Sequence, residues 1–400
     1  MLTRRTLLLG SSAAALGAAV GCSADPVPAT GPSAADGSTS GSTPLPPGPA
    51  SPAGRSASAT PTRTTPSPSP TPRVPRHPTP VLDDVVADGL DVPWGLVFLA
   101  SGDALVGERG TARLRRVTPG GRTRTLGEVA GVVAPTGLGE GGLLGLALAP
   151  GDEETLFAHI TTADDDRVVR MSLRGGRLGR PRVVLAGIPT STHHHGGRLL
   201  FDRGGRLLVS TGDAEQRDLA QDRGSLAGKI LRLRPDGRAA AGNPFGNRTW
   251  SYGHRNVEGL AFDDAGRLWA TEFGDKEADE LNLVRAGRDY GWPDVEGRAE
   301  GSRSTAPAAT WSPTSTCSPA GVAIAGSTAF VGALQGRCLF AVPLDGTRAG
   351  RPRAWFAGEH GRLRTVALAP DRTLWVTTSN TDGRVDPGRD DDKILRLRLT

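Results

Sequence analysis

The chain has 400 residues, with 55 glycines, 32 prolines and few aromatic side chains. Its formal net charge at pH 7 is only +5, and its arginines are scattered over turns without interleaved aromatic residues, which argues against nucleic-acid binding. The first fifth of the chain has a non-globular composition, so about 320 residues remain for one large β domain or two ordinary ones.

Residues 1–22 have the features of an export signal peptide. Arg4 and Arg5 precede an apolar run of about 15 residues, which is too short to span a bilayer comfortably. The TRRTLLL segment resembles a twin-arginine signal, and AAVGC resembles a lipoprotein cleavage site, after which Cys22 would carry the lipid. The alternative is ordinary cleavage with a free Cys22. We expect an exported, extracytoplasmic protein that is anchored to the cell membrane as a lipoprotein.

Residues 23–80 consist mainly of Pro, Ser, Thr, Ala and Gly. A segment with so few large apolar side chains cannot bury enough surface to offset the entropy of ordering. We therefore predict a disordered linker, which would hold the folded domain, residues 81–400, away from the membrane.

Six segments of the domain share one pattern, in which an apolar strand, a polar turn and a second apolar strand follow one another. They begin at Gly95, Gly145, Gly197, Gly259, Gly321 and Thr365. A second motif of alternating apolar and polar residues, such as GKILRLRPDG, follows each copy. Six copies at a spacing of about 44 to 62 residues predict an all-β fold, a six-bladed β-propeller with one four-stranded blade for each repeat. A β-sandwich has no reason to repeat at this period.

The repeat also predicts where functional side chains gather. In each blade the first strand follows the central channel and the second returns, so residues before the first strand and after the second share one face. The residues at these positions are Trp94, Glu140, His194, Asp213, Arg255, Asn256, Gly274, Asp275, Gln335, Arg362 and Arg364. Propellers commonly bind a ligand at such a mouth. General polarity of a propeller rim is the alternative, but it explains poorly a histidine and three arginines at equivalent positions.

His194 lies between His193 and His195 in an HHHGGR segment. Adjacent residues of an extended chain point in opposite directions, so the three imidazoles rarely bind one metal ion together. One imidazole that faces inward as a general base is the sharper interpretation. Asp213 follows the second strand of the same repeat and could orient this imidazole, although taken alone it could equally be a turn residue.

The mouth also combines cationic and acidic groups. Arg255, Arg362 and Arg364, together with Asn256, are suited to an anionic ligand. The acidic loop FGDKEADE, residues 273–280, offers carboxylate and backbone oxygens of the kind that calcium binds, although its spacing is not that of an EF-hand.

Cys317 and Cys338 are the cysteines that remain after Cys22. Two leftover cysteines in an exported chain usually pair, and each lies beside a strand of the same repeat, so we predict a disulfide. The alternative is two buried thiols.

These segments together resemble the soluble PQQ-dependent aldose sugar dehydrogenases of the glucose/sorbosone dehydrogenase family. The resemblance covers residues 82–400, and the segments that carry it are VPWGLVF, GEGGLLGLALAP, HHGGRLLFD, VSTGD, AGKILRLRPDG, NPF, SYGHRNVEGL, DELNLVRAGRDYGWP and GRLRTVALAP. They are specific as a set, whereas each alone is a weak signal. The family is a six-bladed propeller, in agreement with the repeat count.

The resemblance implies specific roles in sugar oxidation. His194 matches the base that takes the anomeric hydroxyl proton while hydride passes to the PQQ ortho-quinone, and Asp213 matches the carboxylate that supports this base. Arg255, with a catalytic role, and Asn256 match residues that contact the quinone. The remaining matches are the cofactor-binding positions Glu140, Gln335, Arg362 and Arg364, the calcium ligands Gly274 and Asp275, and a second calcium site at Glu280 and Tyr290.

Three positions depart from the family pattern. Glu140 stands where Gln is usual, Gln335 stands where a cofactor-binding Lys is expected, and Asp275 replaces a residue that is commonly Pro. The first two changes make the pocket less positive toward a tricarboxylate.

The function we predict is oxidation of aldoses to lactones with PQQ and Ca²⁺, with electrons passed to an external acceptor. One alternative is a non-catalytic, ligand-binding propeller, and another is a calcium-dependent lactonase in which metal-bound water does the chemistry. The set of arginines favours a large anionic cofactor over a small lactone.

Overall fold

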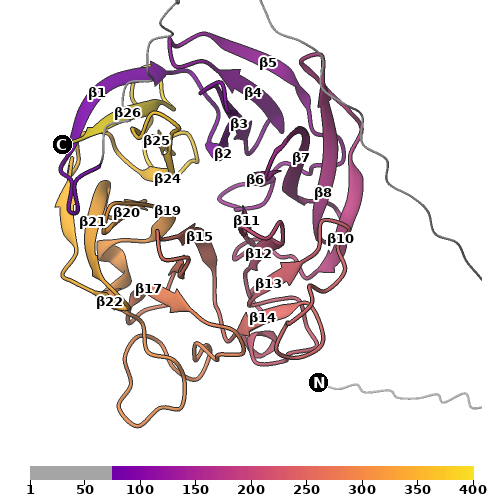
Figure 1. Ribbon diagram of the computed structural model, residues 1–400, viewed down its shortest axis with the longest axis vertical. Coiled ribbons are helices and arrows are strands. Elements are labelled where there is room, and N and C mark those ends of the chain that lie inside the picture. The colour runs from indigo at the N-terminus through magenta and orange to yellow at the C-terminus, as the bar shows by residue number, and fades with distance from the viewer. Residues whose placement is uncertain (1–73) are drawn as a thin grey trace, which may run out of the picture. The chain divides into compact units, whose positions relative to one another are not determined.

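The computed structural model describes residues 74–400, which form six antiparallel sheets around a central axis (Figure 1). Each sheet is one blade, so the predicted six-bladed β-propeller is confirmed. The helical elements among these residues are two short 3-10 turns, η1 (Arg217–Ala220) and η2 (Thr314–Thr316). Within the same residues no helix has the length and apolar character needed to cross a membrane.

The strands of the first three blades are β2 (Pro93–Phe98), β3 (Ala104–Glu108), β4 (Arg113–Val117) and β5 (Thr123–Glu128); β6 (Leu143–Ala149), β7 (Asp152–Thr161), β8 (Asp166–Arg174) and β10 (Arg182–Ile188), with β9 (Arg177–Leu178) beside β8; and β11 (Gly196–Phe201), β12 (Leu207–Thr211), β13 (Lys229–Leu233) and β14 (Thr249–Tyr252). Those of the last three are β15 (Val257–Phe262), β16 (Leu268–Glu272), β17 (Asp279–Val284) and β18 (Ala309–Trp311); β19 (Pro319–Ala325), β20 (Thr328–Ala333), β21 (Cys338–Asp345) and β23 (Arg353–Trp355), with β22 (Arg348–Ala349) beside β21; and β24 (Leu363–Leu368), β25 (Leu374–Thr378), β26 (Ile394–Leu399) and β1 (Pro80–Ala87).

The repeated glycines have a steric cause. The first strands of neighbouring blades converge on the channel, where their backbones approach closely. A Cβ atom on Gly95 would lie 2.4 Å from the carbonyl oxygen of Leu144, and one on Gly145 would lie 2.2 Å from that of Gly197. The second predicted motif coincides with the third strand of each blade, for example β13.

The core lies between the blades rather than at the axis. Each of the six interfaces between neighbouring blades holds one buried apolar cluster. Trp269, Trp375 and Phe330 are almost fully buried in three of them. Burial of such a side chain contributes about 1.5–3 kcal/mol, so the interfaces hold the blades, and therefore the mouth residues, in fixed positions.

The first described strand closes the ring. β1 pairs antiparallel with β26, with Pro80 opposite Leu399. Thr79 and Thr400 then exchange two backbone hydrogen bonds of 2.7 and 3.0 Å. The last blade is therefore built from both ends of the domain.

The predicted signal peptide (1–22), its lipidation site Cys22 and most of the predicted linker (23–80) lie outside the described residues. Residues 74–79 belong to the folded unit: Ser327 donates its backbone N–H to the carbonyl of Arg76 at 2.6 Å, and Val74 packs against the cluster between the fifth and sixth blades. The folded domain therefore begins before residue 81.

The predicted disulfide is wrong, because Cys317 and Cys338 are free, buried thiols. Both lie in the apolar cluster between the fourth and fifth blades, where a thiol packs as a small hydrophobic group. Burial raises the pKa of Cys317 well above its ordinary value and that of Cys338 to about 11, so both thiols stay protonated and unreactive.

Lys229 supports the loop that follows Asp213. Its Nζ donates hydrogen bonds to the carbonyls of Leu219, Ala220 and Ala227 at 2.7, 3.0 and 2.5 Å. We expect Lys229→Met to lower the free energy of unfolding by about 3 kcal/mol, because three carbonyls lose their hydrogen-bond donor. Urea denaturation measures this loss, and a change below about 1 kcal/mol would contradict the assignment.

Candidate functional site

The mouth of the channel brings His194, Asp213, Arg255 and Asn256 together, as predicted. His194 Nδ1 lies 2.7 Å from Asp213 Oδ1, and the backbone N–H of Asp213 donates to the carbonyl of Arg255 at 2.8 Å. The side-chain oxygen of Asn256 accepts the N–H of Gly196 at 2.8 Å. Segments that precede β11 and β15 and follow β12 thus meet at one point.

Asp213 is held by more than the histidine. Its Oδ2 accepts the indole N–H of Trp292 at 2.8 Å, and its Oδ1 also accepts the N–H of Glu215 at 2.8 Å. The guanidinium of Arg255 lies over the Trp292 ring, 5.3 Å from its centroid. Trp292 therefore joins the carboxylate to Arg255, a connection that no motif in the sequence indicated.

The backbone of His194 is fixed in an unusual conformation. Its φ is 62°, in the left-handed region that glycine normally occupies. The N–H of His194 donates to Glu140 Oε2 at 3.0 Å, and its carbonyl accepts the N–H of Ala214 at 3.3 Å. A Cβ on Gly212 would lie 1.7 Å from that carbonyl oxygen, so the glycine of STGD is required for this contact.

These contacts determine which ring nitrogen of His194 is free. The Asp213 carboxylate is fully buried and accepts a hydrogen bond from Nδ1–H, whereas 18% of the histidine side chain is exposed. Nε2 makes no hydrogen bond to any of residues 74–400. A neutral imidazole with N–H on Nδ1 has a lone pair on Nε2, so the pair is suited to remove a proton from a ligand in the mouth.

Arg362 and Arg364 lie in the mouth but are already paired. Arg362 Nε contacts Asp382 at 3.1 Å, and Arg364 contacts Glu258 at 2.7 Å and Asp382 at 3.8 Å. Burial opposes ionisation of Asp382, but Arg362 and Arg364 outweigh it and lower its pKa. The guanidinium groups of the two arginines are thus not unpaired. Part of their charge is neutralised by Asp382 and Glu258, which no motif in the sequence indicated.

Two further arginines of the mouth were also missed. Arg384 contacts Glu140 at 3.2 Å. Arg109 is 3% exposed, and its Nε and Nη1 have no hydrogen-bond partner. Burial, followed by the neighbouring Arg364, lowers the pKa of Arg109 to about 10, so it remains charged near neutral pH. Arg109 directly follows a second strand, β3, so the repeat rule itself could have located it.

A buried guanidinium without a partner is costly unless an anion approaches it. The unpaired guanidinium of Arg109 therefore fits an anionic cofactor bound in the mouth. Gln335 contributes less: it is exposed, and its side chain makes no hydrogen bond to residues 74–400, although its backbone N–H donates to the carbonyl of Cys317 at 3.1 Å.

The acidic loop wraps around a carboxylate that the sequence did not single out. Glu296 Oε1 accepts the backbone N–H groups of residues 275–278 at 2.7 to 3.0 Å. Among the described contacts, nothing donates to the carbonyl oxygens of Gly274 and Asp275. Unpaired oxygens of this kind fit a hard cation such as calcium. The Asp275 carboxylate contacts Arg255 at 3.2 Å.

The loop cannot tolerate a side chain at position 274. A Cβ there would lie 2.2 Å from the carbonyl oxygen of Ala278 and 2.5 Å from Glu296 Oε1. We expect Gly274→Ala to weaken calcium binding at least about tenfold, because the carbonyls must move to relieve these contacts. Isothermal titration of calcium measures the effect, with Gly120→Ala as the control, because a Cβ atom on Gly120 would lie 4.0 Å from its nearest neighbour and φ there is not in the left-handed region. Equal affinity for both variants would exclude the loop as a ligand.

The second predicted calcium site, at Glu280 and Tyr290, borders a cavity of about 10 Å³. This volume is about that of one water molecule or one ion. Glu280 accepts hydrogen bonds from Gly297 and Asn282, and burial, followed by Glu272, raises its pKa to about 8. No cluster of three or more His, Cys, Asp or Glu side chains in residues 74–400 has metal-binding geometry, so an ion here would depend on backbone oxygens.

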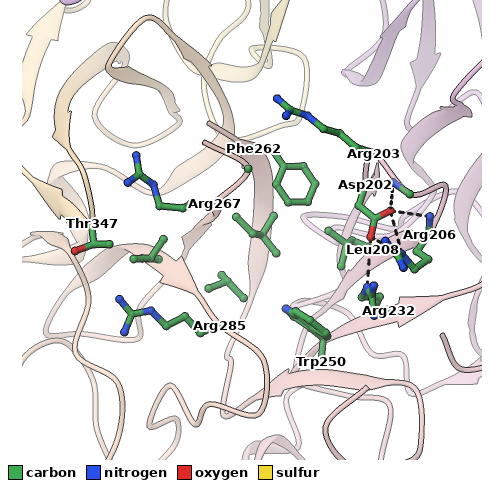
Figure 2. Close-up of a pocket in the computed structure, with 15 residues that line it drawn as sticks. Asp202, Arg203, Arg206, Leu208, Arg232, Trp250, Phe262, Arg267, Arg285 and Thr347 are labelled. Atoms are coloured by element: carbon green, nitrogen blue, oxygen red, sulfur yellow. Dashed lines mark hydrogen bonds and ion pairs between the residues drawn. The ribbon is translucent and has the colours of Figure 1, made fainter. Parts of the chain in front are cut away.

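A larger pocket, of about 470 Å³, lies at the opposite end of the propeller, at the turns after β11 and β15. Figure 2 shows Arg206 and Arg232 directed toward Asp202 beside Trp250, whereas Arg267 and Arg285 lie apart from them along the rim. Since these cations do not converge and no acid–base pair is present, the mouth is the better candidate site.

Comparisons with known proteins find similar proteins over most of the described residues. A family model described as Glucose / Sorbosone dehydrogenase matches residues 90–387. The aldose sugar dehydrogenase YliI of Escherichia coli (strain K12) is 30% identical over 348 residues, which cover 77% of this chain and 92% of that protein. The PQQ-bound aldose sugar dehydrogenase of Streptomyces coelicolor is 46% identical, with a TM-score of 0.78 over 82% of this chain and all of that one. The family match includes every mouth residue from Arg109 to Arg384.

Proposed function

Because the chain belongs to the glucose/sorbosone dehydrogenase family, we propose that it oxidises an aldose sugar at the anomeric carbon with PQQ bound in the mouth. The observation that carries this proposal is the pairing of His194 with buried Asp213, which leaves Nε2 free. The product is a lactone, and the electrons pass to an external acceptor. Residues 1–22 would export the chain, and Cys22 would anchor it to the membrane.

Proton removal from the sugar depends on His194 and on the groups that orient it. His194 Nε2 takes the proton of the anomeric hydroxyl, and the resulting imidazolium is stabilised by Asp213. Trp292 and the N–H of Glu215 donate hydrogen bonds to the carboxylate and hold it aimed at Nδ1. PQQ, when bound, supplies the two-electron acceptor for the hydride.

The same residues account for binding of an anionic quinone. Arg109, with an unpaired guanidinium, and Arg255 supply positive charge from two sides of the mouth. The Gly274 and Asp275 carbonyls would hold a calcium ion beside Arg255. Glu140, where the family has glutamine, is neutralised by Arg384, so this departure adds less negative charge than the sequence alone suggests.

Dye reduction by the full-length protein tests the proposal. The protein is stripped of metal with EDTA and assayed with an aldose, with and without PQQ and Ca²⁺. We expect turnover only when both are restored. Lactone hydrolysis without PQQ would indicate the lactonase instead, and absence of both turnover and PQQ uptake would leave a binding propeller.

A further inference from the structure

Resting on the proposed function, we infer that Arg384 is a positioning residue: it neutralises Glu140 and thereby fixes the His194 backbone and preserves the positive charge of the cofactor site. Arg384 belongs to the loop between β25 and β26, in the last blade. Its Nη2 donates to the carbonyl of Leu138 at 2.8 Å and to Glu140 Oε1 at 3.2 Å. A side chain of the sixth blade therefore reaches the segment that leads into the second blade.

Glu140 connects Arg384 to the backbone of His194. Its Oε2 accepts the N–H of His194 at 3.0 Å, and its own N–H donates to the carbonyl of Thr192 at 2.9 Å. The carboxylate thus uses one oxygen for Arg384 and the other for the residue whose φ is 62°. Burial opposes its ionisation, but the N–H of His194 and the charge of Arg384 lower the pKa of Glu140 below its ordinary value.

The charges of this region explain why the arginine matters. Only 26% of the Glu140 side chain and 22% of the Arg384 side chain are exposed, so water screens the pair weakly. Without Arg384, the negative charge of Glu140 would no longer be balanced and would repel an anionic ligand near Arg109. Glutamine at position 140 would keep an oxygen for the His194 N–H without that charge. The arginine is therefore needed because position 140 is a glutamate.

This reasoning predicts a specific pattern of variants. Arg384→Met should weaken PQQ binding to the apo-protein about tenfold or more, because an ionised carboxylate is left without its partner. Glu140→Gln alone should change the affinity by less than about threefold, and Glu140→Gln with Arg384→Met should restore it to within about threefold of wild type. Arg384→Lys should lie between wild type and Arg384→Met, because lysine keeps the charge but not the fork.

Fluorescence titration of the full-length protein with PQQ measures these affinities. Arg389→Met is the matched control, because Arg389 lies in the same loop with 95% of its side chain exposed. A double variant that binds PQQ no better than Arg384→Met would overturn the proposal. If Arg384 only held the two loops together, removal of the Glu140 charge would not restore PQQ affinity.

A second measurement does not depend on the cofactor. ¹⁵N-histidine NMR spectra of the apo-protein should show a shifted His194 resonance in Arg384→Met and a wild-type resonance in the Arg389→Met control. An unchanged His194 signal in Arg384→Met would overturn the positioning role. Failure of wild-type protein to bind PQQ would refute the proposed function, while this spectrum would still decide the role of Arg384.

Discussion

Alanine at position 194 is expected to lower kcat/KM for sugar-dependent dye reduction by about a thousandfold, because the reaction loses its general base. Thermal stability should hardly change: His194 is partly exposed, and its side chain makes one hydrogen bond, to Asp213. PQQ affinity should also stay close to the wild-type value.

His193→Ala is the control for this variant. His193 is the preceding residue in the chain, but 35% of its side chain is exposed and it contacts Glu215 rather than Asp213. We expect it to keep near wild-type activity. The base would have to be sought elsewhere if the two variants lost activity equally.

Asparagine at position 213 is expected to lower kcat by about a hundredfold or more, although it has nearly the same shape as aspartate. Asp213 accepts hydrogen bonds from His194 Nδ1, from Trp292 Nε1 and from the backbone N–H of Glu215. An amide has one acceptor oxygen, so its NH₂ group must face a donor or force the imidazole into the other tautomer. The second result would leave no lone pair on Nε2.

Trp292→Phe separates the two parts of this effect. It removes the indole N–H from Oδ2 but leaves the carboxylate and its contact with His194. We expect a loss of activity no larger than about tenfold, in line with one hydrogen bond. If Trp292→Phe lost as much activity as Asp213→Asn, the orientation of the carboxylate, and not its charge, would account for the effect.

The repeat made the fold and the location of the mouth predictable from sequence. Glycine recurs at positions such as Gly95 and Gly145 because the backbones of neighbouring inner strands touch at the channel. The number of repeats therefore indicates the number of blades. The position rule then brought His194, Asp213, Arg255 and Asn256 to one end without any knowledge of side-chain contacts.

What the sequence did not predict are the partners of these residues. Asp382 and Arg384 lie in an irregular loop, and Trp292 and Glu296 lie in another, where no periodic pattern places side chains. The pairing of Arg362 and Arg364 was not predictable, because Asp382 lies in the irregular loop after β25 and Glu258 lies in another blade. The disulfide prediction is wrong because the expected compartment and the shared repeat do not reveal that both cysteines pack in an apolar cluster.

The pairing of β1 with β26 has a consequence for how the protein is made. The last blade needs strands from both ends of the domain, so a nascent chain cannot complete it until Leu399 has left the ribosome. Until then the backbone N–H and C=O groups of β1 lack their partner strand. A truncation that removes the final six residues would therefore disrupt both β26 and its partner β1.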